Sequence, residues 1–421
     1  DLGLRRRLAI ITGGPGTGKT RCAARLLALQ LLQQPELRCA LAAPTGKAAR
    51  RLGQSIQAAG DALPQALRSL KPALEGLGRK AGTLHSLLAW RPDEDRCGRN
   101  AAKPLAVDLV IVDEASMMDV LQWRALLAAL PAAASLVVLG DPRQLQSVEA
   151  GRVLGLMVQA AHSGALAGCH MELRENFRFA ERPGIQALAE AVREPELGAL
   201  LKASPLPREG QAADVEGLRS PQVDAALARI WPEVLALASA QDPVSALKAL
   251  NGHRILCAVN DGTWGVAGVT HRIERKLGEW ARSEGRADWC RPVMVLANDP
   301  HTGLANGELG VLMPGPDGGR ACFDQGNEPK GLARSRLPAH ECAWAMSVHR
   351  SQGSEYGTVL VLLPPGGRIT DKIRGLLTPE LLYTAVTRAT RRVILCADEA
   401  ALRVVCGPRE ARLTGLSQWL V

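Results

Sequence analysis

The stretch LAIITGGPGTGKT at residues 8–20 constrains the fold more than any other part of this 421-residue chain. A short apolar run leads directly into the spacing G-x-x-x-x-G-K-T, and a helical pattern follows. This spacing is typical of a loop whose backbone amides surround phosphate oxygens, while its lysine meets the β- and γ-phosphates and its threonine binds Mg²⁺. The sequence therefore predicts a strand, a loop and a helix that hold ATP and Mg²⁺ through Gly14, Pro15, Gly16, Thr17, Gly18, Lys19 and Thr20.

Short apolar runs rich in β-branched residues alternate with helical stretches along the whole chain. Because runs buried on both faces and separated by helices are typical of parallel sheets, the pattern predicts an α/β fold. The predicted strands are 8–12, 39–44, 108–116, 135–141, 253–259, 358–364 and 391–398.

Four other stretches have different patterns. Residues 291–324 contain short apolar runs separated by turn dipeptides, which predicts a small antiparallel insert of about 45 residues. Residues 54–82 are rich in alanine and leucine and predict helix, whereas 91–104 form a polar excursion between a helix and a strand. Several prolines and glycines within 203–222 predict a loop or linker.

Composition narrows the class of protein. The net charge of +9 favours a polyanionic partner, and no apolar run approaches the ~20 residues that a membrane span needs. The ten cysteines contain no CxxC pair, so we expect reduced core residues in a cytoplasmic protein, and a metal cluster that uses His340 and Cys342 is improbable. The chain begins at Asp1 without a methionine, so we expect it to be part of a longer protein.

Further polar residues predict the remainder of a hydrolytic site. Asp113 and Glu114 follow a buried run, where Asp113 can hold Mg²⁺ and Glu114 can deprotonate the attacking water. Gln144 follows the next run, and Arg178 and Arg388 are predicted to reach the γ-phosphate from a second domain. Taken singly, the acidic pair could cap a helix, the glutamine could lie in a polar loop and either arginine could be solvated. A site divided between distant segments predicts that hydrolysis drives movement between two domains.

Eight motifs together resemble superfamily 1 helicases of the 5′-to-3′ class, and most closely the RecD family. The resemblance covers residues 8–398, and its motifs are GGPGTGKT, APTGKAA at 43–49, TLHSLL at 83–88, VDEASM at 112–117, GDPRQL at 140–145, the FR pair at 177–178, VHRSQGSE at 348–355 and YTAVTRA at 383–389.

The resemblance implies two RecA-like P-loop domains with parallel sheets, plus a small SH3-like β-barrel insert, and places ATP between the two domains. The implied boundaries are 1–171 for domain 1A, with a 1B or pin insertion at about 89–106, 172–289 with 338–421 for domain 2A, and 290–337 for the insert.

The same resemblance assigns roles to further residues. Gly353 and Glu355 would line the nucleotide, Tyr383 would support the helix that carries Arg388, and Gln144 would couple the ATP state to DNA. Aromatic residues make up only 3% of the chain, which favours contacts to the nucleic-acid backbone over base stacking. The implied DNA-binding residues are Pro44, Thr45, Lys47, Thr83, His85, Asn298, Asn306, Ser347, His349 and Ser351.

The implied function is an ATP-dependent 5′-to-3′ single-stranded DNA translocase and helicase that acts in recombinational repair of broken ends. Its partners would be single-stranded DNA, duplex junctions, and RecB- and RecC-type subunits. A stand-alone RecD-like helicase, an RNA helicase, and an assembly subunit with little ATPase activity are the alternatives; no nuclease site is expected. The chain departs from the family at Arg350, where lysine is common, and shows no glutamine-containing segment before residue 8.

Overall fold

The computed structural model describes residues 6–91, 96–146, 152–206, 213–219, 222–315, 318–324 and 329–408. These residues fall into two compact units, which divide between Arg178 and Phe179. The second unit is Phe179–Pro408. Each unit is described by itself.

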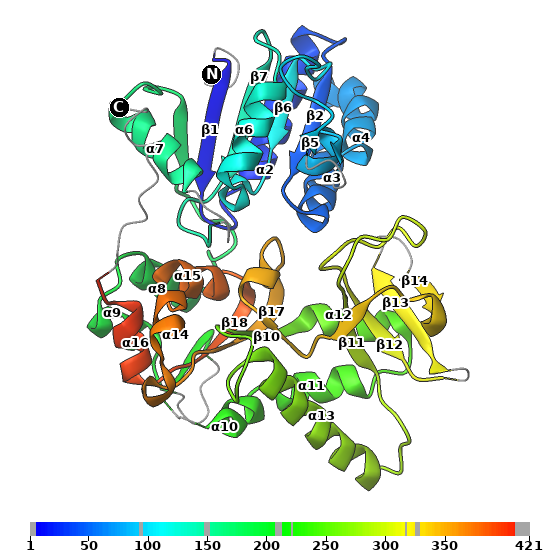
Figure 1. The fold of residues 1–421 in the computed structure, drawn as a ribbon, viewed down its shortest axis with the longest axis vertical. Helices are drawn as coiled ribbons and strands as arrows, with labels where there is room; N and C mark the ends of the chain where they lie inside the picture. Colours follow the sequence, from blue (N-terminus) through cyan, green and yellow to red (C-terminus); the bar gives the residue numbers. More distant parts are fainter. Residues whose placement is uncertain are drawn as a thin grey trace. The chain divides into compact units, whose positions relative to one another are not determined.

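The first unit is built on a parallel sheet with the strand order β3-β2-β6-β7-β1-β8 (Figure 1). The four runs predicted in this part of the sequence all form strands, and β6 is buried along its whole length. The strands are β1 (Leu8–Gly13), β2 (Cys39–Ala43), β3 (Gly82–Thr83), β6 (Leu109–Val112), β7 (Ser135–Gly140) and β8 (His170–Leu173).

Helices cover both faces of this sheet. One core cluster joins the sheet to α2, α3 and α4, and a second joins the other face to α6 and α7. The predicted helix after the phosphate loop is α2, and the region predicted as helical contains the end of α3 and all of α4. The helices are α2 (Lys19–Gln33), α3 (Gly46–Asp61), α4 (Lys71–Arg79), α5 (Leu84–Leu87), α6 (Val120–Ala129) and α7 (Val153–Ser163), with 3₁₀ turns η1 (Gln65–Leu70) and η3 (Ala115–Met117).

The polar excursion contains a short antiparallel hairpin. Strand β4 (Trp90–Arg91) pairs with β5 (Arg96–Cys97), and residues 92–95 lie outside the described residues. Ala89 has a φ of 50°, a left-handed conformation that non-glycine residues rarely adopt. Its carbonyl accepts a hydrogen bond from the Gly98 amide, which closes the base of the hairpin.

The second unit contains another parallel sheet, with the strand order β16-β10-β17-β18-β9. The three runs predicted in this region form β10, β17 and β18. Together the two parallel sheets confirm the predicted α/β class. The strands are β9 (Val215–Leu218), β10 (His253–Cys257), β16 (Ala345–Ser347), β17 (Tyr356–Leu362) and β18 (Ala389–Cys396).

The prediction of a loop or linker over 203–222 is wrong for β9, which lies at the edge of this sheet. Glu216 interrupts the apolar pattern of the strand and is buried. Its carboxylate accepts hydrogen bonds from Arg229 and Arg392, so the burial of its charge is compensated. Because this charged residue interrupts a strand of four residues, the sequence lacks the continuous apolar run by which the other strands were predicted.

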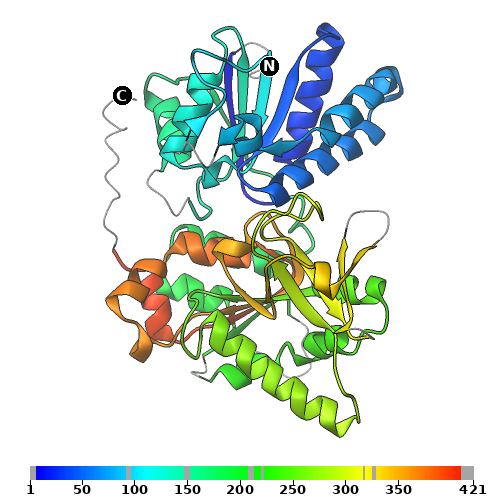
Figure 2. The ribbon, with the colours of Figure 1, turned by 45° about the vertical axis from the view of Figure 1, so that its right-hand side comes forward.

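One large core cluster joins helices α10, α11, α12 and α13 to strands β10, β17 and β18. The helices of the second unit can be followed in Figure 2. They are α8 (Pro183–Arg193), α9 (Leu197–Ala203), α10 (Val223–Ala228), α11 (Trp231–Ala238), α12 (Pro243–Gly252), α13 (Val266–Ser283), α14 (Asp371–Leu376), α15 (Pro379–Val386) and α16 (Glu399–Val405), with 3₁₀ turns η5 (Arg334–Arg336), η6 (His349–Ser351) and η7 (Gly366–Arg368). Within the described ranges, none of the helices combines the length and apolar character needed to cross a bilayer.

An antiparallel sheet lies between α13 and β16 in the sequence and is drawn mainly in yellow in Figures 1 and 2. Its strand order is β14-β13-β12-β11-β15, and it packs on α12 through the shared core cluster. Strands β11, β12 and β13 lie within the stretch 291–324 that was predicted to be antiparallel, whereas β14 and β15 lie beyond it and were not predicted. The strands are β11 (Arg291–Val295), β12 (Leu309–Met313), β13 (Arg320–Asp324), β14 (Pro329–Ala333) and β15 (His340–Cys342).

Candidate functional site

The loop between β1 and α2 is closed by its own side chains. Lys19 Nζ donates to the carbonyl oxygens of Gly13 at 2.7 Å and Gly14 at 3.0 Å, and Thr17 Oγ1 also donates to Gly14 O. Gly16 and Gly18 both have a φ of 82°, which an L-residue adopts only with strain. The N-cap residue of α2 is Gly18, which has no side chain that could cap the helix, so the amides of the first turn are suited to an anion. All seven predicted residues from Gly14 to Thr20 lie in this loop and the start of the helix.

Asp113, the residue directly after β6, contacts the start of α2. Thr20 Oγ1 donates to Asp113 Oδ2 at 3.1 Å, and the Glu114 amide donates to Asp113 Oδ1 at 2.8 Å. Burial, and next the charge of Glu114, raise the pKa of Asp113 to about 6, against the opposing effect of Lys19. A divalent cation would remove both penalties, and a hydroxyl beside a carboxylate supplies the oxygen ligands that Mg²⁺ prefers. Thr20 and Asp113 therefore fit the predicted Mg²⁺.

The backbone after Asp113 is strained. Glu114 has a φ of 53°, a left-handed conformation that costs about 1–3 kcal/mol for a residue other than glycine. The turn that follows packs on Gly140 at the end of β7, where an added Cβ would lie 3.3 Å from the Ser116 amide nitrogen. Strain of this kind is concentrated at functional sites, which is consistent with the predicted functional role of Glu114.

Gln144 lies in the loop after β7 and is buried. Its Nε2 donates to Asp141 Oδ2 at 3.4 Å, and the Arg143 amide donates to Asp141 Oδ1 at 3.0 Å. Asp141 is itself buried, and the sequence reading did not single it out. The carboxylate of Asp141 thus organises the loop that carries Gln144.

Hydrogen bonds hold the segment 176–178, after β8, against the phosphate loop, and we call this contact the Asn176 brace. Asn176 Nδ2 donates to Pro15 O at 3.0 Å, and its Oδ1 accepts from the Arg178 amide at 3.0 Å. The Phe177 amide donates to Gly16 O at 3.1 Å, while the Phe177 side chain is 65% exposed. The sequence analysis did not single out Asn176, and the nearest motif that it used was the FR pair at 177–178.

Arg178 differs from its prediction in one respect. It was predicted to come from the second domain, whereas it belongs to the first unit. The reason is the Asn176 brace: a Cβ added to Gly16 would lie 2.4 Å from Arg178 Cβ, so this residue packs directly on the phosphate loop.

The predicted nucleotide residues of the second unit lie around Arg388. Arg388 is buried, with Nε donating to Thr384 O at 3.1 Å and Nη1 donating to Ser354 O at 3.2 Å. These contacts join α15 to the turn that contains Gly353, which has a φ of 70°, and Glu355. Tyr383 is buried on α15, and its carbonyl accepts from Thr387. The structure therefore brings Arg388, Tyr383, Gly353 and Glu355 into one region of the second unit.

The predicted DNA residues of the first unit follow two neighbouring strands. Thr45 caps α3 by accepting from the Ala48 amide, and Thr83 caps α5 by accepting from the Ser86 amide. Because β2 and β3 are parallel neighbours, their carboxyl ends place Pro44, Thr45 and Lys47 beside Thr83 and His85. The exposed His85 ring meets Trp90 edge to face, with centroids 5.7 Å apart.

The predicted DNA-binding residues of the second unit differ in their exposure to solvent. In the connection between β11 and β12, Asn298 and Asn306 are exposed, and Asn298 Oδ1 accepts a hydrogen bond from the Asn306 amide at 2.9 Å. Ser347 ends β16, and burial lowers the pKa of His349. Ser351 is fully buried and donates its hydroxyl to Val348 O, so that hydroxyl is not available to a ligand.

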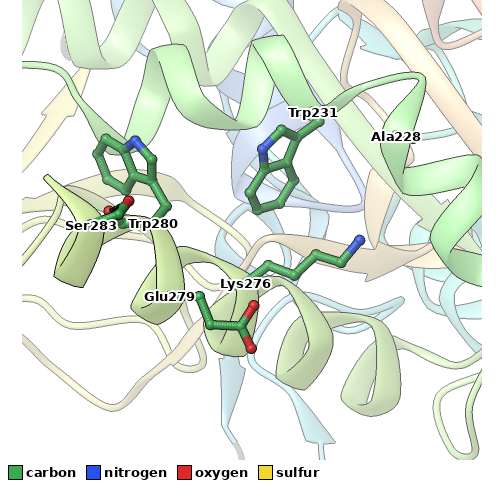
Figure 3. Close-up of a pocket in the computed structure, with 6 residues that line it drawn as sticks. All are labelled: Ala228, Trp231, Lys276, Glu279, Trp280 and Ser283. Atoms are coloured by element: carbon green, nitrogen blue, oxygen red, sulfur yellow. Dashed lines mark hydrogen bonds between the residues drawn. The ribbon is translucent and has the colours of Figure 1, made fainter.

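A separate pocket of about 510 Å³ lies between α11 and α13 (Figure 3). Lys276 Nζ lies 5.8 Å from the centroid of the Trp231 ring, and Trp280 lines the same hollow. None of the predicted site residues lines this pocket. We place the candidate site at the phosphate loop because the chemistry of its residues, and not the size of a hollow, identifies it.

Among the described residues, no three histidine, cysteine or acidic side chains lie close enough together to hold a metal ion. All ten cysteines are free, and four of them are buried.

Comparison with known proteins gives the family. The profile of an AAA domain matches residues 2–150, and that of a UvrD-like helicase C-terminal domain matches residues 342–396. The RecBCD enzyme subunit RecD of Mycolicibacterium smegmatis is 39% identical over 428 residues, which cover 99% of this chain and 73% of that protein. The chain belongs to the RecD family.

Two further RecD relatives have different lengths. The RecBCD enzyme subunit RecD of Haemophilus influenzae is 32% identical and covers 98% of this chain and 70% of its own. The ATP-dependent RecD2 DNA helicase of Deinococcus radiodurans is also 32% identical, but the match spans 97% of this chain and 50% of that protein. Among solved structures, the Bacteroides Pif1 bound to single-stranded DNA is similar with a TM-score of 0.47 and 18% identity, over 96% of this chain and 92% of that one.

Proposed function

We propose that this RecD-family chain is an ATP-dependent 5′-to-3′ single-stranded DNA translocase and DNA helicase. The observation that carries the proposal is the contact of Thr20 with Asp113 beside Lys19, because it places a hydroxyl, a carboxylate and a cation at one phosphate loop. Such a group has the parts that phosphoryl transfer from ATP requires.

The proposed chemistry uses the chain's own residues in defined roles. The loop amides and Lys19 bind the phosphates of ATP, and Thr20 and Asp113 would hold Mg²⁺, which neutralises charge that develops on the phosphate oxygens. Glu114 orients the attacking water and accepts its proton. Phe177, exposed beside the loop, offers an aromatic face to the nucleobase.

Three further residues are proposed to respond to the γ-phosphate. Arg178 and Arg388 neutralise its charge, and the loss of such an arginine typically lowers the rate by about 10³- to 10⁵-fold. Gln144 couples the state of the nucleotide to the DNA. In this scheme Lys19 leaves the carbonyls of Gly13 and Gly14 when it meets the phosphates.

We propose that DNA is held mainly through its backbone. The presented groups are hydroxyls, amides and helix caps, which suit phosphate and sugar and carry no base sequence. The Asn298–Asn306 pair would extend this surface onto the antiparallel sheet, which we interpret as the SH3-like insert. The β4–β5 hairpin would be the 1B or pin element beside His85.

The biological setting is also a proposal. The RecBCD subunits among the relatives favour a role with RecB- and RecC-type partners in recombinational repair, in the cytoplasm. The match to a RecD2 DNA helicase keeps a stand-alone helicase as the second candidate. Reconstitution with and without RecB- and RecC-type subunits distinguishes the two, because only the first requires them for full activity.

The test of the ATPase proposal is Lys19→Ala, assayed with and without single-stranded DNA. We expect DNA-stimulated ATP hydrolysis to be lost while the folded structure, followed by circular dichroism, is retained. Retained hydrolysis in this variant would contradict the proposed site.

A further inference from the structure

Arg254, the second residue of β10, is 2% exposed. Its charge is buried, and its partners among the described residues are two backbone carbonyls and the Tyr356 ring, with no carboxylate among them. Nη1 donates to Ala343 O at 2.8 Å and Nη2 donates to Leu250 O at 2.9 Å, while Nε has no hydrogen-bond partner in the described part of the chain. The guanidinium carbon lies 4.8 Å from the centroid of the Tyr356 ring. Burial lowers the pKa of Arg254, which shows that the position is costly for a cation.

Two of these contacts lie near the point where the chain enters and leaves the antiparallel sheet, at Pro292 and Ala343, which we call the neck of the sheet. The chain enters this sheet at β11 and leaves it at β15, and the Ala343 amide donates to Pro292 O at 2.9 Å, which ties the two crossings together. Leu250 belongs to α12, whose core cluster includes residues of β12 and β13. Arg254 therefore fastens the neck of the sheet to the helix on which that sheet packs.

The third contact leads towards Arg388. The Tyr356 amide donates to Arg388 O at 2.9 Å, and the Arg388 side chain bonds to Ser354 O two residues earlier. From Ala343 the chain runs through β16 to Ser347 and His349, two of the predicted DNA-binding residues. The stacked pair of Arg254 and Tyr356 thus joins the end of the antiparallel sheet to the backbone of the proposed catalytic arginine.

We propose that Arg254 is a positioning residue that couples DNA binding at the antiparallel sheet, Ser347 and His349 to the placement of Arg388. The inference rests on the proposed function, since it assumes that Arg388 acts in ATP hydrolysis. A neutral side chain of similar length could fill the same space and bury no charge, so packing alone gives no reason for an arginine here. Its two carbonyl contacts and its aromatic contact suit a rigid, planar, forked cation.

The test is the ratio of ATPase rates with and without saturating single-stranded DNA. For Arg254→Met we expect this ratio to fall at least about tenfold, with the dissociation constant for single-stranded DNA changed less than about threefold. The matched control is Arg392→Met, because Arg392 lies four residues after Arg388 on β18 but pairs with Glu216 towards β9. Arg392→Met should keep the wild-type ratio of ATPase rates with and without single-stranded DNA.

Two more variants keep the inference testable if Arg254→Met does not fold. Tyr356→Leu removes the ring while the two carbonyl contacts of Arg254 can remain, and it should lower the ratio in the same way. Arg254→Lys keeps the positive charge but not the forked geometry of the guanidinium. It should recover less than half of the DNA stimulation that is lost in Arg254→Met. In the double variant of Arg254 and Tyr356 the losses should not multiply, since both residues act through one contact.

The contrary outcomes are distinct. A lower melting temperature with an unchanged DNA-stimulation ratio in Arg254→Met, or in Tyr356→Leu, would show a structural role only and overturn the inference. An equal loss in Arg392→Met would also overturn it. If the wild-type chain shows no DNA-stimulated hydrolysis, the proposed function itself fails, before any variant is compared.

Discussion

Two glycines of the phosphate loop allow a matched test of the brace formed by Asn176. Gly16 and Gly18 have the same φ of 82°, so alanine at either position meets the same backbone strain. Their surroundings differ: an added Cβ at Gly16 lies 2.4 Å from Arg178 Cβ and 3.0 Å from Asn176 Oδ1, whereas at Gly18 it meets no described atom within 4 Å. Comparison of Gly16→Ala with Gly18→Ala therefore isolates the contact with the 176–178 segment.

The magnitude follows from the contacts. A left-handed L-residue costs about 1–2 kcal/mol, which is the whole expected loss for Gly18→Ala. In Gly16→Ala the 176–178 segment must move, and the hydrogen bonds from Asn176 Nδ2 to Pro15 O and from Phe177 N to Gly16 O are lost. At about 0.5–1.5 kcal/mol each, they add about 1–3 kcal/mol. We expect Gly16→Ala to lower the free energy of unfolding by about 2–5 kcal/mol in total.

The assay is urea denaturation without nucleotide, so that no phosphate contact contributes to the difference. Far-ultraviolet circular dichroism and tryptophan fluorescence should both be followed, because two units can unfold separately. Equal losses in the two variants would refute the reasoning, since the brace would then contribute nothing to the stability of the loop.

Three further predictions concern the metal, the base and pH. Thr20→Val removes a proposed Mg²⁺ ligand, and the Mg²⁺ concentration for half-maximal ATPase should rise about 10- to 100-fold in a metal titration. Phe177→Ala should raise the KM for ATP about three- to tenfold with little change in the melting temperature, because the ring is exposed. Burial, and next the charge of Arg254, lower the pKa of His253 to about 3, below its unfolded value near 6.5. The unfolded state then binds the proton first, so the free energy of unfolding should fall by about 1.4 kcal/mol per unit as pH drops from 6.5 towards 3, and His253→Leu should remove that slope in acid denaturation.

The sequence predicted those parts of the fold that depend on local patterns. The runs that became β1, β6 and β7 are apolar and buried on both faces, so their identity did not depend on distant partners. The phosphate loop and Asp113 were predictable for the same reason, since parallel strands bring their carboxyl ends to one edge.

The rest depended on contacts between distant residues. Asn176 is 161 residues from Pro15, and its amide side chain has no periodic signature that could indicate this contact. Glu216 is buried in a strand with its charge compensated by Arg229 and Arg392, and those partners come from other elements. The burial of the Ser351 hydroxyl and the charge of Arg254 inside the second unit were equally beyond a reading of local pattern.

The most direct test of the proposed helicase uses two duplexes that differ only in whether the single-stranded tail is 5′ or 3′. The account predicts ATP- and Mg²⁺-dependent unwinding of the 5′-tailed DNA, and no unwinding of it by Lys19→Ala. Preference for the 3′-tailed duplex would contradict the proposed direction of movement. Unwinding that persists without ATP, or in Lys19→Ala, would contradict the claim that hydrolysis at this loop drives the strands apart.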